Sequence, residues 1–541
     1  MEIVFDVIIK NGKVIDGAGN PWFKADVGIN GQKISEIGRL SAEKASEIID
    51  ATGLVVSPGF VDMHSHSDLV LLINPKAESK IRQGITTEVI GNCGGSAAPL
   101  NDLMKQEMKK TTGCIEEAEL QLDWSTMKDY LNRLDRQGVA VNVVSLVGHA
   151  NIRVSTTGFA DRAPIKTELE EMKKMLAQAM EDGAFGMSTG LIYPPGCYAK
   201  TDELVELSKV VASYRGLYTS HIRGEGEKLL ESVKEAVEIG EKAGLPVEIS
   251  HHKAGGKANW GKVNESLKII EDARGRGIDV TCDVYPYVAA SFGLSAMLPP
   301  WTHEGGTEKL VERLRDAKTR ERLRREMGEE TASGSSPLKA VGWDATQIAR
   351  SQNHPDLEGK TVSEIAQTKN MDPFALVFDL LTEDPAISVV RFAMCEDDVC
   401  TVVRHPVSMI GTDGSAVAPY GVLGKGKPHP RSYGTFPRVL GRYVREERIL
   451  TLENAIRKMT SLPAQRLGLR DRGIIREGMY ADITIFNPET IRDRATYQNP
   501  HQYPDGIEYV IVNGRIAVEK REHTGALAGR VILPYRVPAG G

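Results

Sequence analysis

Hydrophobic positions follow two patterns along the middle of the chain. Short apolar runs alternate with longer segments in which apolar residues recur every three or four positions, a spacing typical of amphipathic helices. The clearest helical segments are 167–181, 202–214, 227–243 and 263–274. Strands that alternate with helices in this way predict a parallel sheet with helical crossovers.

The apolar runs number eight, which is the count that closes a (β/α)8, or TIM, barrel. They centre near residues 60, 88, 144, 186, 219, 249, 282 and 410. We therefore predict an α/β fold in which residues 57–474 form a TIM barrel.

The two chain ends differ from the middle. Residues 1–56 and 475–541 contain short β-like pieces broken by glycine-rich turns, without helical spacing. The ends of a domain often lie close together. We therefore expect both ends to contribute to one small β-sandwich domain.

The segment before the last barrel strand is unusually long. Between residues 287 and 407 lie a Pro-Pro-Trp motif, a highly charged helical stretch and a Gly/Ser-rich break. We predict that residues 292–350 are an insertion and a candidate lid over the barrel mouth, because long insertions in compact domains are commonly functional. The alternative is an oligomer contact or plain surface elaboration.

The composition agrees with a large enzyme. The chain has 541 residues, of which 41% are apolar, and a formal net charge of −6. A barrel alone needs about 250 residues, so additional domains are expected. Acidic and basic residues are mixed throughout, without the basic stripe of a nucleic-acid-binding protein, so we expect no nucleic-acid partner.

The cysteines bear on the cellular compartment. The six, at positions 93, 114, 197, 282, 395 and 400, show neither metal-finger spacing nor a dense disulfide framework, and reduced thiols are the simpler account. The N-terminus lacks a signal-peptide pattern, and no segment is apolar for long enough to span a membrane. We expect a cytoplasmic protein without a membrane partner, and a homo-oligomer is compatible with this sequence.

Metal-binding residue types stand at the C-terminal ends of the predicted strands, which converge on one face of a barrel. They are His64, His66, Cys93, His221, His251 and Asp413. His64 and His66 are two positions apart, so on a strand both point to the same face. Thiolate and imidazole ligands suit zinc, and a carboxylate can act as a general base.

Each of these residues, taken singly, could be an ordinary packed core residue. Six at matched strand ends, in a set of types that zinc accepts, favour a metal site instead. His149 and His252 lack this support, and we leave them out of the site.

The six residues resemble the metal site of the amidohydrolase superfamily. Three motifs resemble its D-aminoacylase (N-acyl-D-amino-acid deacylase) branch over nearly the whole chain: Gly-Asn-Cys-Gly-Gly at 91–95, Ser-His-Ile-Arg-Gly-Glu at 220–225 and His-Pro-Arg-Ser-Tyr-Gly-Thr-Phe at 429–436. Hydantoinase-like relatives carry a carboxylated lysine on the fourth strand, whereas 184–189 contains none. In the D-aminoacylase branch a cysteine on the second strand takes its place, and Cys93 matches.

The resemblance implies zinc-dependent hydrolysis of small-molecule N-acyl-D-amino acids to a carboxylate and a free D-amino acid. It assigns one tightly bound Zn²⁺ to Cys93, His221 and His251. It places a second, weaker metal position at His64, His66 and Asp413, and gives Asp413 the catalytic proton transfer. Its substrate-binding positions match Arg431, Lys253, Tyr193, Tyr285 and Ser291. Arg223 and Glu225 are expected beside the metal ligands.

Two other functions stay open at this point. A cyclic-amide hydrolase of the hydantoinase or dihydroorotase kind is disfavoured by the missing lysine. A non-catalytic scaffold of the same fold is disfavoured because all the expected ligands are present.

Overall fold

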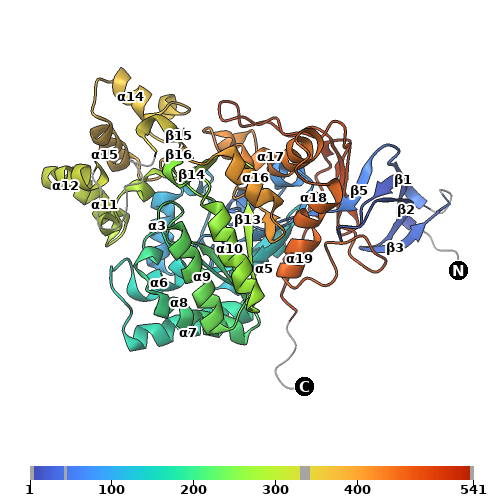
Figure 1. Cartoon of the computed structure of the whole chain (residues 1–541), viewed down its shortest axis with the longest axis horizontal. Helices are drawn as coiled ribbons and strands as arrows, with labels where there is room; N and C mark the ends of the chain where they lie inside the picture. Colours follow the sequence, from blue (N-terminus) through green and yellow to red (C-terminus); the bar gives the residue numbers. More distant parts are fainter. Residues whose placement is uncertain (1–4, 42–44, 329–340, 536–541) are drawn as a thin grey trace.

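The computed structural model describes residues 5–41, 45–328 and 341–535. The parts of the predicted terminal domain at 1–4, 42–44 and 536–541, and of the predicted insertion at 329–340, lie outside the described residues. A large α/β body fills the centre of the molecule, with a β-rich end at the right of Figure 1 and a cluster of helices at the left.

Parallel strands form the centre of the α/β body in two hydrogen-bonded sheets. The smaller has the order β6 (Phe60–Asp62), β7 (Ile85–Ile90) and β8 (Asn142–Ser145). The larger has the order β17 (Ser408–Ile410), β13 (Val280–Val284), β12 (Val247–Ile249), β11 (Leu217–His221), β10 (Gly186–Gly190) and β9 (Val147–Gly148).

Two backbone contacts connect the two parallel sheets. Only Leu146 separates β8 from β9, and its backbone N–H donates to Ile90 O of β7 at 2.9 Å. At the other edge, an isolated parallel bridge joins Ser65, beyond β6, to Gly414, beyond β17. This arrangement is consistent with the predicted TIM barrel.

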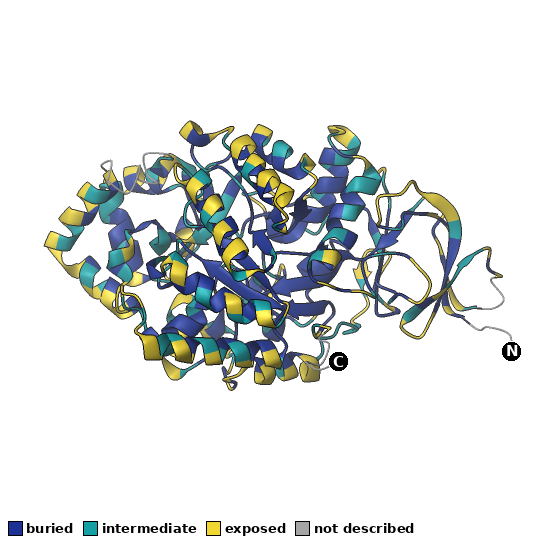
Figure 2. Ribbon diagram, turned by 60° about the horizontal axis from the view of Figure 1, so that its bottom comes forward, coloured by how far each residue is buried: buried dark blue, intermediate teal, exposed yellow. Residues whose placement is uncertain are grey.

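Amphipathic helices cover the outside of the strands, with their exposed faces outward (Figure 2). In α9, for example, Leu229, Val233, Ala236 and Val237 are buried at helical spacing, and Gly244 ends the helix in the left-handed conformation that glycine favours. The longer outer helices are α5 (Met127–Gln137), α7 (Lys166–Asp182), α8 (Thr201–Ser213), α9 (Leu229–Ala243), α10 (Val263–Gly275), α16 (Glu396–Arg404) and α18 (Leu452–Met459).

Shorter helices connect the strands or follow them. They are α1 (Val70–Ile73), α2 (Glu78–Ile81), α3 (Asp102–Thr111), α4 (Cys114–Glu117), α6 (His149–Thr157), α17 (Arg431–Arg438), α19 (Ser461–Arg466) and the π-helix η9 (Val439–Glu446). The 3₁₀ turns are η2 (Gly196–Tyr198), η3 (Lys257–Asn259), η4 (Leu294–Met297), η5 (Pro300–His303), η6 (Trp343–Ala345), η7 (Pro355–Leu357) and η8 (Gly421–Gly424).

Both chain ends contribute to one nine-stranded sheet, in which β5 from the first end pairs antiparallel with β18 from the second. Its strands are β1 (Phe5–Val14), β2 (Phe23–Asn30), β3 (Lys33–Gly38), β4 (Ala45–Asp50), β5 (Val55–Pro58), β18 (Ile483–Phe486), β19 (Ile507–Val512), β20 (Arg515–Glu519) and β21 (Glu522–His523). A two-layer sandwich in this region stays a prediction.

The long segment between β13 and β17 builds a unit with its own apolar core. An antiparallel sheet of order β14 (Ala289–Gly293), β16 (Ser388–Phe392), β15 (Thr346–Arg350) carries the helices α11 (Thr307–Arg315), α12 (Ala317–Gly328), α14 (Val362–Thr368) and α15 (Pro373–Glu383). These helices form the left end of Figure 1. Within the described part of the chain, no helix has the length and apolarity needed to cross a membrane.

Candidate metal centre and active site

The structure brings all six predicted metal ligands into one cluster, in which His66 and Cys93 are partly buried and the other four are buried. Their potential ligand atoms form two groups, within each of which every pair of atoms lies within 4.8 Å. One group is Cys93, His221 and His251, and the other is His64, His66, Cys93 and Asp413. Cys93 belongs to both groups, so its sulfur lies between them.

The first group offers one sulfur and two ring nitrogens. Cys93 Sγ lies 3.4 Å from His251 Nε2, and His251 Nε2 lies 2.9 Å from His221 Nδ1. Sulfur and nitrogen ligands placed tetrahedrally around zinc lie roughly 3.3–3.8 Å from one another. The donor types therefore fit zinc, and so does the sulfur–nitrogen spacing, while the two nitrogens are slightly closer.

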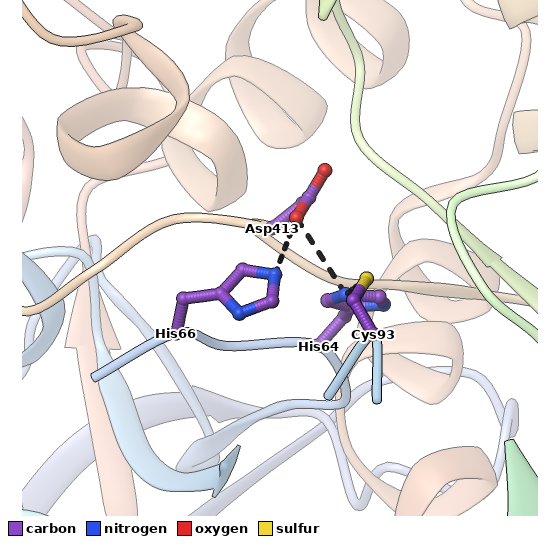
Figure 3. A group of neighbouring side chains, drawn as sticks. All are labelled: His64, His66, Cys93 and Asp413. Carbon is purple, nitrogen blue, oxygen red and sulfur yellow. Dashed lines mark hydrogen bonds and ion pairs between the residues drawn. The ribbon is translucent and has the colours of Figure 1, made fainter. Parts of the chain in front are cut away.

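The second group is centred on the carboxylate of Asp413 (Figure 3). Asp413 Oδ1 lies 3.0 Å from His66 Nε2 and 3.5 Å from His64 Nε2. Cys93 Sγ is 3.3 Å from His64 Nε2. His64 and His66 point to the same side of their strand end, as their spacing predicts.

Three of the six candidate ligands adopt the left-handed backbone conformation that is usual for glycine. The φ angles of Cys93, His251 and Asp413 are 53°, 37° and 49°. Such a conformation costs about 1–3 kcal/mol for a residue other than glycine and is concentrated at functional sites. At these positions the chain turns sharply where it leaves a strand, and this turn directs the side chain into the cluster.

The loop that carries Cys93 packs directly on the end of the fourth strand, β10. A Cβ atom on Gly190, the last residue of β10, would lie only 2.1 Å from Cys93 O. A Cβ atom on Gly94 would lie 2.5 Å from Gly190 N. The backbone of the cysteine loop therefore occupies the space beside this strand end, which gives a physical reason why β10 ends in glycine.

Comparison with known proteins agrees with this geometry. A sequence profile described as "Amidohydrolase family" matches residues 47–518. The chain belongs to the amidohydrolase family. This amidohydrolase is 38% identical to the N-acyl-D-glutamate deacylase of Alcaligenes xylosoxydans xylosoxydans, over 95% of this chain and 94% of that protein. It is 35% identical to the D-aminoacylase of the same organism, over 98% and 97% of the two chains.

Solved structures extend the likeness to the fold. The crystal structure of N-acyl-D-glutamate deacylase from Bordetella bronchiseptica, complexed with zinc and a phosphonate inhibitor, matches with a TM-score of 0.82 and 35% identity over 98% of this chain and 99% of that one. A D-hydantoinase structure matches with a TM-score of 0.56 and 16% identity, which shows a shared fold only. The predicted resemblance to the D-aminoacylase branch is confirmed.

The charge state of the cluster follows from its burial and its neighbours. Burial disfavours the Cys93 thiolate, but the charges of His64 and His251 outweigh burial and hold the pKa of the thiol well below its usual range. Burial likewise opposes ionisation of Asp413, yet the charges of Arg431 and His251 and a hydrogen bond to His66 hold its pKa well below the ordinary value. In this amidohydrolase the neighbouring charges therefore favour the ionised form of both side chains.

Two carboxylates contact the candidate ligand histidines at the ring nitrogens that do not face the cluster. Glu225 Oε1 lies 3.0 Å from His251 Nδ1, as expected for a residue beside the ligands. Asp283, in β13, accepts a hydrogen bond from His251 N at 2.8 Å and lies 3.2 Å from His64 Nδ1. Contacts of this kind fix the ring orientation of a metal-binding histidine. The sequence reasoning missed Asp283, although it lies near the end of an apolar run as the six ligands do.

Arg223 makes its hydrogen bonds to groups other than the candidate metal ligands. Its guanidinium pairs with Glu235 at 2.9 Å and donates to the carbonyl oxygens of Cys197 and Ala199 at 3.0 and 2.9 Å. Arg223 therefore ties the loop after β10 to α9.

Two of the five predicted substrate-binding residues line a cleft of about 480 Å³ at the metal cluster. Arg431 and Ser291 form its wall together with His66 and Asp413. Arg431 Nη1 donates to Asp413 Oδ2 at 2.7 Å, and its Nη2 donates to Ser291 O at 3.2 Å. The guanidinium therefore lies between the Asp413 carboxylate and the antiparallel sheet of β14, β16 and β15.

The other three predicted residues lie against the first metal group and outside the described lining of this cleft. The Tyr193 ring is centred 5.0 Å from that of His221. Lys253 Nζ lies 2.8 Å from His251 Nδ1 and 2.5 Å from Glu225 Oε1. The hydroxyl of Tyr285 is buried without a hydrogen-bond partner among the described residues.

The two histidines left out of the site have partners elsewhere. His149 Nε2 lies 2.9 Å from Glu203 Oε1, and His252 Nε2 lies 2.8 Å from Ser266 Oγ. Both are buried, and neither belongs to a metal-binding group in the described part of the chain.

Proposed function

We propose that this chain hydrolyses the amide bond of N-acyl-D-amino acids and releases a carboxylate and a free D-amino acid. The observation that carries the proposal is the cluster of Cys93, His221 and His251 beside a cleft that Asp413 and Arg431 line. The high similarity to deacylases over the full chain supports the same reaction class.

One zinc ion is proposed for Cys93, His221 and His251, and a second, weaker position for His64, His66 and Asp413. Bound zinc supplies Lewis-acid polarisation of the scissile carbonyl and makes a water molecule more acidic. The Cys93 thiolate matches the charge that such an ion requires. Glu225 and Asp283 hold the histidine rings in the orientation that points their other nitrogens into the cluster.

Asp413 performs the proton transfer in this proposal. Its Oδ1 faces the cluster, and its Oδ2 is held by Arg431. The carboxylate accepts a proton from the attacking water and later delivers it to the nitrogen of the leaving amino acid. A proton acceptor held in place by two partners needs little reorganisation for each transfer.

Arg431 is proposed to bind the α-carboxylate of the substrate, because a planar guanidinium matches a carboxylate through two parallel hydrogen bonds. Lys253, Tyr193, Tyr285 and Ser291 are proposed to complete that pocket. A bound carboxylate would then share Arg431 with Asp413, which would place the acyl group next to the metal cluster.

The finer architecture is also a proposal. The bridge between Ser65 and Gly414 supports closure of the barrel between β17 and β6. We propose a sandwich domain from residues 1–56 and 475–541, a barrel over 57–474, and a lid within the insertion at 292–350. The positions of Ala349 and Arg350 in the cleft wall support the lid.

A substrate panel tests the proposed function. We expect zinc-replete protein to release free amino acid from N-acetyl-D-amino acids and to leave their L-enantiomers intact. Hydantoin and dihydroorotate serve as the cyclic-amide controls. Turnover of the cyclic amides without turnover of the N-acetyl-D-amino acids would contradict the proposal and favour the cyclic-amide alternative.

A further inference from the structure

A buried lysine contacts the chain neighbours of His64, His66 and Asp413 and has no part in the proposed mechanism. Lys80, in α2, is 0% exposed. Its ammonium lies within hydrogen-bond distance of four oxygens, one more than its three hydrogens can serve at once. They are Asp62 Oδ2 and Thr412 Oγ1, each at 2.6 Å, Gly414 O at 2.9 Å and Ser65 Oγ at 3.0 Å.

One partner of Lys80, Ser65, lies between the candidate ligands His64 and His66 in the segment after β6. Successive side chains of an extended chain point to opposite sides. His64 and His66 point to the cluster, whereas the hydroxyls of Ser65 and Ser67 donate to Glu88 Oε2 at 2.6 and 2.7 Å. Glu88 Oε2 is itself 3.6 Å from Lys80 Nζ. A polar layer therefore lies on the reverse side of the histidine segment.

The segment after β17 is attached to the same layer on both sides of Asp413. Lys80 contacts Thr412 and Gly414, the two neighbours of Asp413 in the chain. Asp62 accepts hydrogen bonds from Thr412 N at 2.8 Å and from Thr412 Oγ1 at 2.7 Å. Asp413 itself contributes only its backbone N–H, which donates to His64 O at 2.8 Å.

We propose that Lys80 is a positioning residue that fixes the Asp413 segment against the His64–His66 segment. Through these contacts it sets the 3.0 Å distance between Asp413 Oδ1 and His66 Nε2. A buried ion pair adds little net stability compared with apolar side chains of similar volume. The main effect of Lys80 is therefore on geometry. The catalytic part of this inference rests on the proposed function.

A second buried lysine provides a matched control. Lys458, in α18, is also 0% exposed, and its ammonium donates to Ser408 O and Oγ at 3.0 and 3.1 Å. Ser408 begins the same strand, β17, whose other end leads to Asp413. Lys80→Met and Lys458→Met thus remove the same group from opposite ends of one strand.

The test compares kcat and KM on an N-acetyl-D-amino acid, zinc content, and a crystal structure of each variant. For Lys80→Met we expect kcat to fall by about 100-fold, the loss that a misplacement of about 1 Å can produce. We expect KM to change by less than about threefold, because the loss falls on the transition state and not on substrate binding. We also expect the Asp413 Oδ1–His66 Nε2 distance to exceed hydrogen-bond range, with one zinc retained. Lys458→Met should keep kcat and this distance.

Unchanged kcat together with an unchanged Asp413–His66 distance in Lys80→Met would overturn the inference, and so would equal losses of kcat in the two lysine variants. If Lys80→Met does not fold, Lys80→Met/Asp62→Asn removes both charges of the pair and is judged by the same criteria. If the wild-type protein hydrolyses none of the N-acetyl-D-amino acids, the proposed function fails. The distance in the variant crystal structures still decides the role of Lys80 in that case.

Discussion

Asp413 combines two opposing requirements at the scale of a single residue. In the proposed mechanism it must be ionised to accept a proton, and it is buried, which disfavours ionisation. The charges of Arg431 and His251 resolve the conflict in favour of the carboxylate. The backbone at φ 49° then directs this carboxylate into the cluster.

Replacing Asp413 with asparagine should separate proton transfer from zinc binding. The amide has nearly the same shape but cannot accept the proton, so we expect kcat to fall by about two to four orders of magnitude, the usual contribution of a general base. Zinc content should stay near one per chain, because Asp413 belongs to the weaker metal group in our proposal. Near-normal turnover in a zinc-replete Asp413→Asn protein would contradict the assigned role.

Replacing Arg431 with alanine should affect both substrate binding and the ionisation of Asp413. We expect a loss of about 1.5–3 kcal/mol in kcat/KM for an N-acetyl-D-amino acid, the range for a hydrogen bond to a charged group. A smaller loss is expected for the carboxamide analogue, and Arg431→Lys should restore only part of the activity.

The pH profile of Arg431→Ala provides a second measurement. Because Arg431 lowers the pKa of Asp413, its removal should raise that pKa. Activity needs the ionised base, so the acid limb of kcat/KM should move to higher pH. Equal losses on the acid and the carboxamide would indicate that Arg431 supports the fold or the metal site.

Some residues of the site could be predicted from the sequence, and others could not. The spacing of His64 and His66 was sufficient to predict that both face one site. Asp283 also lies near the end of a strand. It belongs to none of the three family motifs, so the sequence did not single it out. Lys80 lies in a four-residue helix, and its role depends on contacts with a segment more than three hundred residues away. No local pattern predicts such contacts.

At the scale of elements, β13 connects the two metal groups. Asp283 near its end contacts His64 of the second group and the backbone of His251 of the first. The strand lies between β12, which leads to His251, and β17, which leads to Asp413. The antiparallel sheet of β14, β16 and β15 begins shortly after β13 with β14, which brings Ser291 to the cleft.

Replacing Asp283 with asparagine should therefore weaken metal binding. Loss of such a carboxylate partner typically costs 10–100-fold in metal affinity. Competition of the protein with a chelator would measure this affinity. Asp279→Asn is the control, because Asp279 precedes the same strand, at the end away from the candidate metal ligands. It pairs with Arg274 at 3.2 Å and with Arg466 at 2.9 and 3.0 Å. A similar zinc affinity in both variants would contradict the role of Asp283.

Element boundaries were harder to predict from sequence than element types. The alternation of strands and helices indicated the parallel body, because each buried strand and each amphipathic helix has a local signature. The small antiparallel sheet takes its central strand from residues 388–392, beyond the predicted insertion at 292–350. Pairing between β14 and β16 is long-range, and a short apolar run does not show which strand it will join.

At the scale of the whole molecule, strands from distant parts of the chain meet at one cluster of candidate metal ligands. These residues come from the ends of β7, β11 and β12 and from the segments after β6 and β17. The apolar core around the strands consists of hydrophobic residues and includes none of the six candidate ligands. We therefore expect the fold to form without zinc, whereas the proposed chemistry requires it.

The most direct test of this account is a zinc titration of metal-free protein. Chelated protein should keep its circular dichroism spectrum and show no hydrolysis of an N-acetyl-D-amino acid. Activity should rise in proportion to added zinc and reach its maximum at one zinc per chain, and Cys93→Ala should stay inactive at the same zinc concentration. Full activity in the metal-free protein, or in zinc-supplemented Cys93→Ala, would contradict the account.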